Sequence, residues 1–507
     1  MKKLQFIILL AAGSLGLSAQ SIDNLSLFNS TDLHGSPRYV GMGGAFTALG
    51  NDMSALHLNP AAGSVFRKDN FSFSLGFQNR QQQTDFLGNQ QEFNDFNFVL
   101  GNIGLVKKFG PQNKFYFSVS YQQLADFDNN YTATGENVYQ LNGDIETGLT
   151  LGEYWRDGAL DFTPDELASM GLLEEASSLG TVLLTDTTTG FSYPDYFADE
   201  SSTLNYRVEE TGGRNEFAIN LGGNAEDKFY YGMGIGFTNL NYRKTSTLTE
   251  YGYLDTVPPV PNVRESIVNR TNRLDASGIN LKFGFIYRPI QAVRLGASIE
   301  TPTWWYRVSE LQSVSVDARL TDGSVFRGTE YLADDIEYAV QSPTIIRAGG
   351  AFVIGKFAII SADYEYSNSQ NLNLSERDGF DYSDFQQEWR DATQESHTLK
   401  GGVEFRFGPT YLRGGYQYRT SYFKEQFEFE SARQVYSIGF GYKSGPVGID
   451  LAYNLAQFSG QTYVHPALAY GYNLNSGEPI ENYDTNRAVM PTETQKGNFV
   501  VGMNFSF

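Results

Sequence analysis

Few residues in this chain could carry acid–base, nucleophilic or metal chemistry. The 507 residues include no cysteine and only four histidines, His34, His57, His397 and His465. The histidines are far apart and lack the ligand spacing of a zinc site, so we predict no structural metal. Because the chain has no cysteine, we also predict no disulfide. A lipid-modifying hydrolase would need a serine beside His397 or His465, and the sequence singles out no such serine. We predict no catalytic residue and no cofactor.

Two other patterns could suggest ligand chemistry. Gly232, Gly234 and Gly236 form a G-x-G-x-G run, but it lies within a predicted strand and opens no helix, so it cannot cradle a phosphate as a dinucleotide-binding loop does. The acidic pairs 165–166 and 174–175 could suggest a cation site, although solvated helix charges explain them better. The formal net charge of −21 argues against nucleic acid as a partner and favours acidic, solvated loops.

The N-terminus has the pattern of an export signal. Lys2 and Lys3 precede the apolar run Leu4–Ala12, which is too short to span a bilayer, and Ala19 suits signal-peptidase cleavage. We therefore predict a signal peptide over residues 1–19. No later run of about 18 apolar residues could form a transmembrane helix.

The rest of the chain alternates between apolar and polar residues with a period of two, which predicts β-strands. At the C-terminus, Phe499, Val501, Met503, Phe505 and Phe507 alternate with mostly small or polar residues. Similar segments recur near residues 71–77, 115–121, 229–237, 281–287, 399–407 and 447–455. We predict an all-β fold over residues 71–507: a transmembrane antiparallel β-barrel of about 14 strands.

A soluble β-sandwich also alternates, and three features favour a barrel. Ionic residues share the second face of the strands, as a wet lumen permits; they include Asp363, Glu365, Lys400 and Glu404. The aromatic run Trp304–Tyr306 is placed where an interfacial girdle belongs. Short connections alternate with long ones, the latter including Thr84–Glu92, Ala133–Ser202, Asp317–Asp335 and Leu374–Thr393.

This parity places both termini in the periplasm and the long loops outside the cell. We therefore predict a protein of the Gram-negative outer membrane, in contact with its lipid and lipopolysaccharide and monomeric. The terminal Phe507 fits the signal that the barrel-assembly machinery recognises.

Residues 20–70 do not alternate, and small residues dominate them in Gly41–Ala48, Asn51–Ala55 and Asn59–Ala62. We interpret this segment as a hatch, a compact plug inside the barrel; the alternative is a flexible periplasmic leader. The segment resembles the FadL/TodX family of outer-membrane hydrophobic-compound transporters, whose G-x-A, D-x-S and N-P-A hatch signature is matched by Gly44, Ala45, Ala48, Asp52, Ser54, Asn59, Pro60 and Ala61.

The resemblance implies passive uptake of small hydrophobic molecules, such as long-chain fatty acids or aromatic hydrocarbons. In that family the ligand enters a lumen blocked by the hatch and leaves sideways, through a gap at an inward-kinked strand. The third predicted strand, which ends at Leu124–Asn130, is the candidate for that kink.

The long loop 133–202 contains one helix signal, Thr163–Glu166 followed by Leu167, Met170 and Leu173. This helix could offer an apolar landing surface at the extracellular mouth, or it could simply pack on its own loop. Three other functions remain open: a porin or channel for polar solutes, a lipid-modifying barrel enzyme, and an adhesin acting through the acidic loops.

Overall fold

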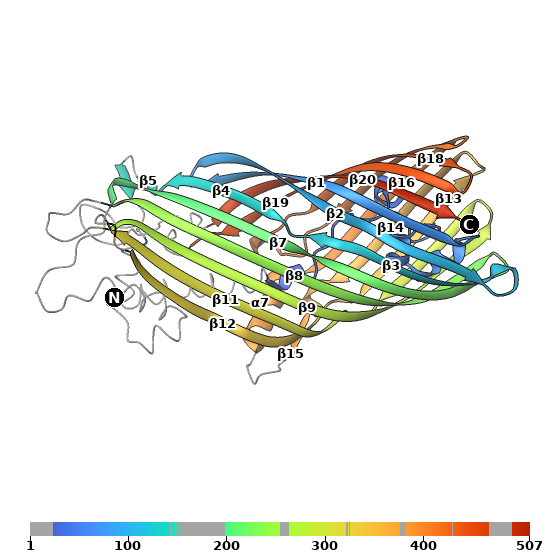
Figure 1. Cartoon of the computed structure of the whole chain (residues 1–507), viewed down its shortest axis with the longest axis horizontal. Coiled ribbons are helices and arrows are strands. Elements are labelled where there is room, and N and C mark those ends of the chain that lie inside the picture. The colour runs from blue at the N-terminus through green and yellow to red at the C-terminus, as the bar shows by residue number, and fades with distance from the viewer. Residues whose placement is uncertain are drawn as a thin grey trace, which may run out of the picture.

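A closed antiparallel barrel forms the body of the protein (Figure 1). The computed structural model describes residues 24–141, 144–147, 151, 198–253, 263–320, 323, 325–375, 382–427, 429–465 and 489–507. The predicted signal peptide and the predicted helix 163–173 lie outside these residues. The barrel closes where β1 (Asn70–Phe86) pairs with β20 (Val489–Ser506).

The wall consists of fourteen strands, as the alternation predicted, and three of them are interrupted. The uninterrupted ones, besides β1 and β20, are β2 (Asn89–Phe109), β7 (Ala198–Ala225), β8 (Phe229–Tyr253), β9 (Val263–Ile290), β14 (Ala358–Asn368), β16 (Glu395–Phe407), β17 (Thr410–Arg419), β18 (Arg433–Ser444) and β19 (Val447–Tyr463). The interrupted ones are β3 (Phe115–Asp126) with β4 (Asn129–Glu136), β10 (Val293–Glu300) with β11 (Trp304–Leu320), and β12 (Val325–Gln341) with β13 (Ile345–Ile354). The short strand β15 (Asn373–Ser375) pairs with β12 and extends the wall beyond β14. Outside the wall lie the hairpin β5 (Val138–Leu141) and β6 (Asp144–Thr147) and the helix α7 (Ser383–Ala392).

Large apolar side chains face outward all around the wall. On β8, Phe229, Tyr231, Met233, Ile235 and Phe237 are each at least two-fifths exposed, and comparable residues occur on the other strands. A continuous apolar belt of this kind would be unfavourable in water, whereas hydrocarbon accepts it. Within the described residues no helix has the length and apolarity needed to cross a bilayer. The apolar belt on the outer face of the strands is the feature that places the barrel in a membrane.

The inward face carries the ionic residues, as predicted. Asp363, Lys400 and Glu404 are all less than a tenth exposed on the lumen side. The predicted aromatic girdle Trp304–Tyr306 was wrong for one of its three residues, Trp305. Trp304 and Tyr306 are 40% and 55% exposed on the outer face, but Trp305 is 1% exposed and faces the lumen. Adjacent strand residues must point to opposite faces, so the three could not share one girdle.

Two predicted long links proved to be largely strand. Within Thr84–Glu92, β1 and β2 are joined by a tight turn at Leu87 and Gly88, both with positive φ. Within Asp317–Asp335, β11 continues to Leu320 and β12 begins at Val325. Polar residues dominate both segments, and strands that leave the membrane no longer need an apolar outer face.

The wall is uneven in height. β7, β8 and β9 have 28, 25 and 28 residues, whereas β16, β17 and β18 have 13, 10 and 12. About 10 tilted residues cross a bilayer, so the long strands continue well beyond it. Figure 1 shows the short turns and the C-terminus at one end and the long strands extending to the other.

The N-terminal hatch lies inside the barrel, as predicted. It contains α2 (Pro37–Gly41), α3 (Ala55–Leu58) and the 3-10 helix η1 (Pro60–Val65). The side chain of Ser36 caps α2, and that of Asn59 caps η1. Val40, Met42 and Phe46 are fully buried and pack with wall residues, so the hatch and the wall share one apolar core.

Candidate functional site

The D-x-S pair of the hatch forms a buried polar knot. Asp52 accepts hydrogen bonds from the Ser36 hydroxyl, at 2.7 and 2.8 Å, and from the Ser54 N–H at 2.9 Å. The Ser54 hydroxyl in turn accepts from the Ser36 N–H at 2.7 Å and from the Asn102 amide of β2 at 3.1 Å. Burial raises the pKa of Asp52. The knot both orders the hatch and attaches it to the wall.

The N-P-A sequence makes a second attachment. The Asn59 amide donates to the carbonyls of Thr47 (2.7 Å) and Phe285 of β9 (3.2 Å) and accepts from the Ala61 N–H at 3.0 Å. The Tyr116 hydroxyl of β3 donates to the Pro60 carbonyl. Asn59 is 0% exposed, so each of these bonds is made in a dry environment where an unpaired amide would be costly.

The small residues of the hatch allow close approach to the wall, where glycines meet them. Gly44 has φ +73°, which favours glycine, and Ala45 and Ala48 are fully buried. A Cβ on Gly415 of β17 would lie 2.1 Å from the Gly43 nitrogen. The G-x-G-x-G run lies in β8, as predicted, and a Cβ on Gly232 would lie 2.6 Å from the Pro60 carbonyl carbon. Sequence analysis did not identify these wall glycines as hatch contacts.

Three ionisable hatch residues bind charged residues of the wall. Arg38 binds Glu404 of β16 through Nε at 2.8 Å and Nη2 at 3.1 Å, and Asp32 binds Arg433 of β18 and Lys496 of β20. Burial alone would raise the pKa of Asp32, but the charges of Lys496 and Arg433 outweigh it and hold the pKa well below 3.8.

The third attachment is His57, whose Nδ1 lies 2.7 Å from Glu216 of β7. Glu216 is 0% exposed and also binds Lys282 of β9. From there, alternating charges continue around the wall through Glu300, Arg347, Glu365 and Lys400, with separations of 2.7–3.9 Å. Each buried charge has an opposite neighbour, which offsets its desolvation cost.

Ser120, His57 and Glu216 together have the connectivity of a hydrolase triad. The Ser120 hydroxyl lies 3.0 Å from His57 Nε2, on the opposite side of the ring from Glu216. Ser120 and His57 are only 2% and 3% exposed, neither lines the cavities described below, and Glu216 is already neutralised by Lys282. A substrate has no room at Ser120, so the arrangement attaches the hatch. The sequence gives no sign of this arrangement, in contrast to the candidates His397 and His465, because the partners of His57 lie 63 and 159 residues away in the chain.

No group of three potential metal ligands occurs in the described part of the chain. His397 contacts Tyr364, with Nδ1 2.8 Å from the phenol oxygen. His465 is buried and His34 lies beside Asp32 at 3.5 Å, so the structure does not bring the four histidines together.

The third strand is interrupted in the segment singled out as a possible kink. β3 ends at Asp126 and β4 begins at Asn129, with a register irregularity between Gln123 and Ala125. The ladder between β2 and β3 ends at the pair Asn102–Gln122. The stretch 89–101 of β2 therefore pairs with β1 but has no backbone ladder on its other side.

Side chains bridge this missing ladder. The Asn97 amide of β2 donates to Asp126 (3.0 and 3.1 Å) and Asp128 (3.1 Å). The Asn130 amide donates to Asp95 at 2.8 Å, and the Gln91 amide donates to the carbonyl of residue 134 at 2.8 Å. The wall is thus continuous here, but flexible side chains replace rigid backbone pairing.

An apolar cluster leads from the hatch to this interruption. Phe28 of the hatch packs on Trp305 with ring centroids 5.2 Å apart, and Phe127 packs on Tyr242 at 5.7 Å. The same cluster includes Trp389 of α7. The cluster therefore extends from Trp389 of α7 and Phe28 of the hatch to Phe127, at the break between β3 and β4.

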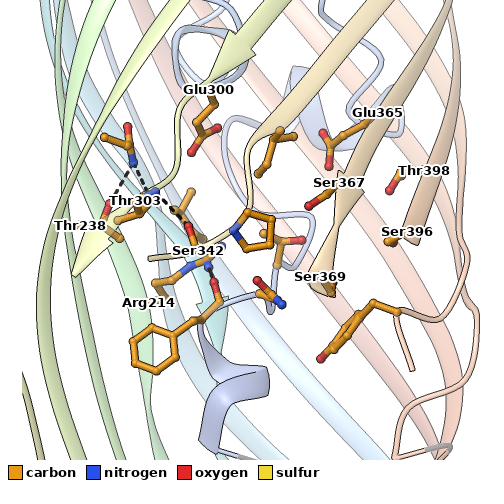
Figure 2. A pocket seen from close by; sticks show the side chains of 18 of the residues that line it. Arg214, Thr238, Glu300, Thr303, Ser342, Glu365, Ser367, Ser369, Ser396 and Thr398 are labelled. Carbon is orange, nitrogen blue, oxygen red and sulfur yellow. Dashed lines mark hydrogen bonds between the residues drawn. The ribbon is translucent and has the colours of Figure 1, made fainter. Parts of the chain in front are cut away.

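Cavities beside this cluster are lined mainly by polar groups. One of about 180 Å³ lies between the hatch segment 26–32 and the strand interruption, bounded by Phe127 and Lys496 among others. A second, of about 70 Å³, lies between Phe28 and the wall (Figure 2). Figure 2 shows Ser367, Ser396 and Thr398 on one side of it and Arg214 and Thr238 on the other.

No protein-family model matches the sequence. No curated protein matches it either. Solved structures do share its architecture. A FadL homologue of Pseudomonas aeruginosa is 12% identical, with 94% of this chain and 99% of that chain covered and a TM-score of 0.50. The toluene transporter TodX of P. putida is 13% identical, with the same coverage and a TM-score of 0.51. A TodX mutant described as a monoaromatic hydrocarbon channel is 13% identical, with 94% and 100% covered and a TM-score of 0.52.

At such low identity the likeness concerns the fold, and it extends over nearly the whole of both chains. Together with the outward apolar belt, it identifies the kind of protein. The chain is an outer-membrane β-barrel that contains an N-terminal hatch, with the fold of a FadL homologue and of TodX.

Proposed function

We propose that this protein carries small hydrophobic molecules passively through the outer membrane. The hatch closes the direct route to the periplasm, and cargo leaves sideways at the interruption between β3 and β4. The observation that carries this proposal is the apolar cluster that begins at Phe28 and Trp389 and ends at Phe127, where the ladder to β2 is missing. An apolar solute on this route would contact the apolar side chains of the cluster, whereas the open cavities beside the cluster are lined mainly by polar residues.

The size of the cavity at the interruption supports small cargo. An engineered apolar cavity of roughly 150 Å³ holds benzene, and the cavity beside Phe127 measures about 180 Å³. A single aromatic ring fits that space without displacement of the hatch, whereas a long acyl chain requires it to move. The toluene named for TodX falls in this size class, so we favour monoaromatic hydrocarbons over long-chain fatty acids.

The hatch motif has a supporting role in this proposal. Ala48 lets the hatch backbone approach Gly296 of β10, and Gly44 and Ala45 let the hatch pack tightly on itself. Asp52 and Ala61 order the hatch internally, and Ser54, Asn59 and Pro60 attach it to the wall. The protein would act as a monomer, in contact with lipid and lipopolysaccharide, and Phe507 would serve the assembly machinery.

Chemical cross-linking across the interruption tests the lateral exit. The chain lacks cysteine, so Asn97→Cys with Asp128→Cys can be bridged by a short, reducible bismaleimide. Uptake of radiolabelled toluene by cells of a Gram-negative host without its own toluene uptake should fall on cross-linking and recover on reduction. A control pair, Gln81→Cys with Gln495→Cys, bridges an intact ladder between β1 and β20 and should leave uptake unchanged. Unchanged uptake in the cross-linked Asn97–Asp128 protein would contradict a lateral exit.

A channel for polar solutes is the second candidate, because charged and hydroxyl side chains line much of both lumen cavities. Planar-bilayer conductance separates the two. The hatched transporter should conduct poorly, whereas a polar channel should pass a steady ion current.

A further inference from the structure

The largest of the described cavities lies at the opposite end of the barrel from the proposed cargo route. It measures about 520 Å³ and is enclosed by the underside of the hatch and by the short-turn ends of the wall strands. Its boundary includes Arg38 and Asp52 of the hatch, Tyr230 of β8 and Asp450 of β19. We call it the periplasmic vestibule. Its volume is in the range of small-ligand sites.

The vestibule is strongly basic in a protein that is strongly acidic overall. Eight lysine or arginine side chains line it against three carboxylates, a formal excess of five positive charges, while the whole chain has a net charge of −21. Two of the three carboxylates are occupied: Glu404 binds Arg38 and Arg413, and Asp450 binds Arg413. The third, Asp52, is bound by Ser36 and Ser54.

The remaining basic side chains have no carboxylate partner within the described part of the chain. They are Arg67, Lys68, Arg288, Arg294, Arg406 and Lys443. Arg406 instead stacks over Tyr411, and Arg288 over Tyr230. Unpaired like charges gathered around one cavity repel one another, and a bound anion would relieve that repulsion.

Arg294 gives an independent indication of a ligand. Its Nη1 donates to the Leu49 carbonyl at 2.8 Å, but its Nε is buried and has no hydrogen-bond partner. Three other guanidinium groups, those of Arg38, Arg288 and Arg67, lie near enough to repel it. A buried guanidinium N–H without an acceptor is costly, so the site is suited to a ligand that supplies one.

We infer that the periplasmic vestibule binds an anion that carries a phosphate group, held chiefly by Arg67, Arg288 and Arg294. A phosphate offers several oxygens and up to two negative charges, and planar guanidinium groups bind it with paired hydrogen bonds. The group could belong to a periplasmic solute or to the head group of an inner-leaflet phospholipid. This site is distinct from the proposed cargo route and does not depend on it.

Calorimetric titration of the full-length protein in a neutral detergent tests this inference. Inorganic phosphate and dihexanoyl phosphatidic acid serve as the two probes, with acetate as a singly charged control. At least one phosphate probe should bind saturably, at least tenfold more tightly than acetate, and binding should weaken as salt is added. Tighter binding of inorganic phosphate indicates a solute, and tenfold tighter binding of the lipid indicates a head group.

Substitution then assigns the binding to the vestibule. Arg67 is exposed and precedes the first strand, so Arg67→Gln should fold normally, and Arg67→Gln with Arg294→Gln should weaken binding at least tenfold. Arg273→Gln is the control, because Arg273 is 65% exposed on the extracellular half of β9 and should not matter. If neither probe binds more tightly than acetate, or if the Arg67→Gln protein and the double variant both bind as the Arg273→Gln protein does, the inference is wrong.

Discussion

The contact between Gly415 of β17 and Gly43 of the hatch allows a sharp test of how the hatch is seated. In Gly415→Ala the new Cβ would lie 2.1 Å from the Gly43 nitrogen, whereas ordinary contacts begin at 3.4 Å. The hatch backbone must therefore move by about 1.3 Å, since the obstructing atoms are main chain and cannot rotate away. Overpacking of this kind costs roughly 1–3 kcal/mol. If only the seated hatch bears that cost, the unseated population rises roughly 5- to 150-fold.

Planar-bilayer conductance and protease cleavage within residues 24–65 both measure this population. Gly414→Ala is the matched control on the same strand, because its new Cβ would meet only Val403 Cγ2, at an ordinary 3.6 Å. We expect Gly415→Ala to show more frequent open-channel events and faster cleavage, and Gly414→Ala to behave as wild type. Equal behaviour of the two variants would refute the idea that backbone-to-backbone contact seats the hatch.

Three further predictions concern the attachments and the strand interruption. Glu216→Gln leaves the buried Lys282 with Glu300, 3.9 Å away, as its remaining counter-charge and should destabilise the folded barrel by about 3–5 kcal/mol in heat-modifiability assays. Glu209→Gln, 47% exposed on the same strand, should cost under about 1 kcal/mol, and similar losses would contradict the buried network. The lowered pKa of Asp32 contributes stability that is complete above about pH 4 and is lost as the pH falls through the folded-state pKa. Asp32→Asn should therefore destabilise the protein at pH 7 and make its loss of stability in acid less steep. An unchanged slope of stability against pH in acid would exclude this role for Asp32. Asn97→Ala removes the bonds to Asp126 and Asp128 and should speed hydrogen exchange in β4, whereas unchanged exchange would show that these bonds do not hold the interruption closed.

The sequence predicts the barrel well because a lipid-facing strand must place an apolar residue at every second position. That requirement is local, and it holds from Phe71 to Phe507. The alternation disappears where strands leave the membrane. The paired ends of β1 and β2 on either side of their turn, from Asn79 to Phe93, are mostly polar and resemble a loop in the sequence. The helix α7 was not predicted either, because no capping side chain marks its first turn. A tertiary contact, the packing of Trp389 on Phe423, holds it in place.

The attachments of the hatch could not be predicted, because they join residues that are distant in the chain. Arg38 and Glu404 are 366 residues apart, and Asn59 and Phe285 are 226 apart. Finding such pairs requires the register of every strand. One signal was available in the sequence: Glu216 and Lys282 occupy positions of lumen-facing parity in their strands, where a charge must find a partner.

The close fit of hatch and wall constrains the order of assembly. The hatch directly precedes β1, and the wall is completed only when β20, the last strand of the chain, pairs with β1. At wall glycines such as Gly232 and Gly415 the hatch backbone lies so close that not even a methyl group would fit between hatch and wall. We therefore expect the N-terminal segment to be in place when the two ends of the chain meet, so that the cylinder is completed around the hatch.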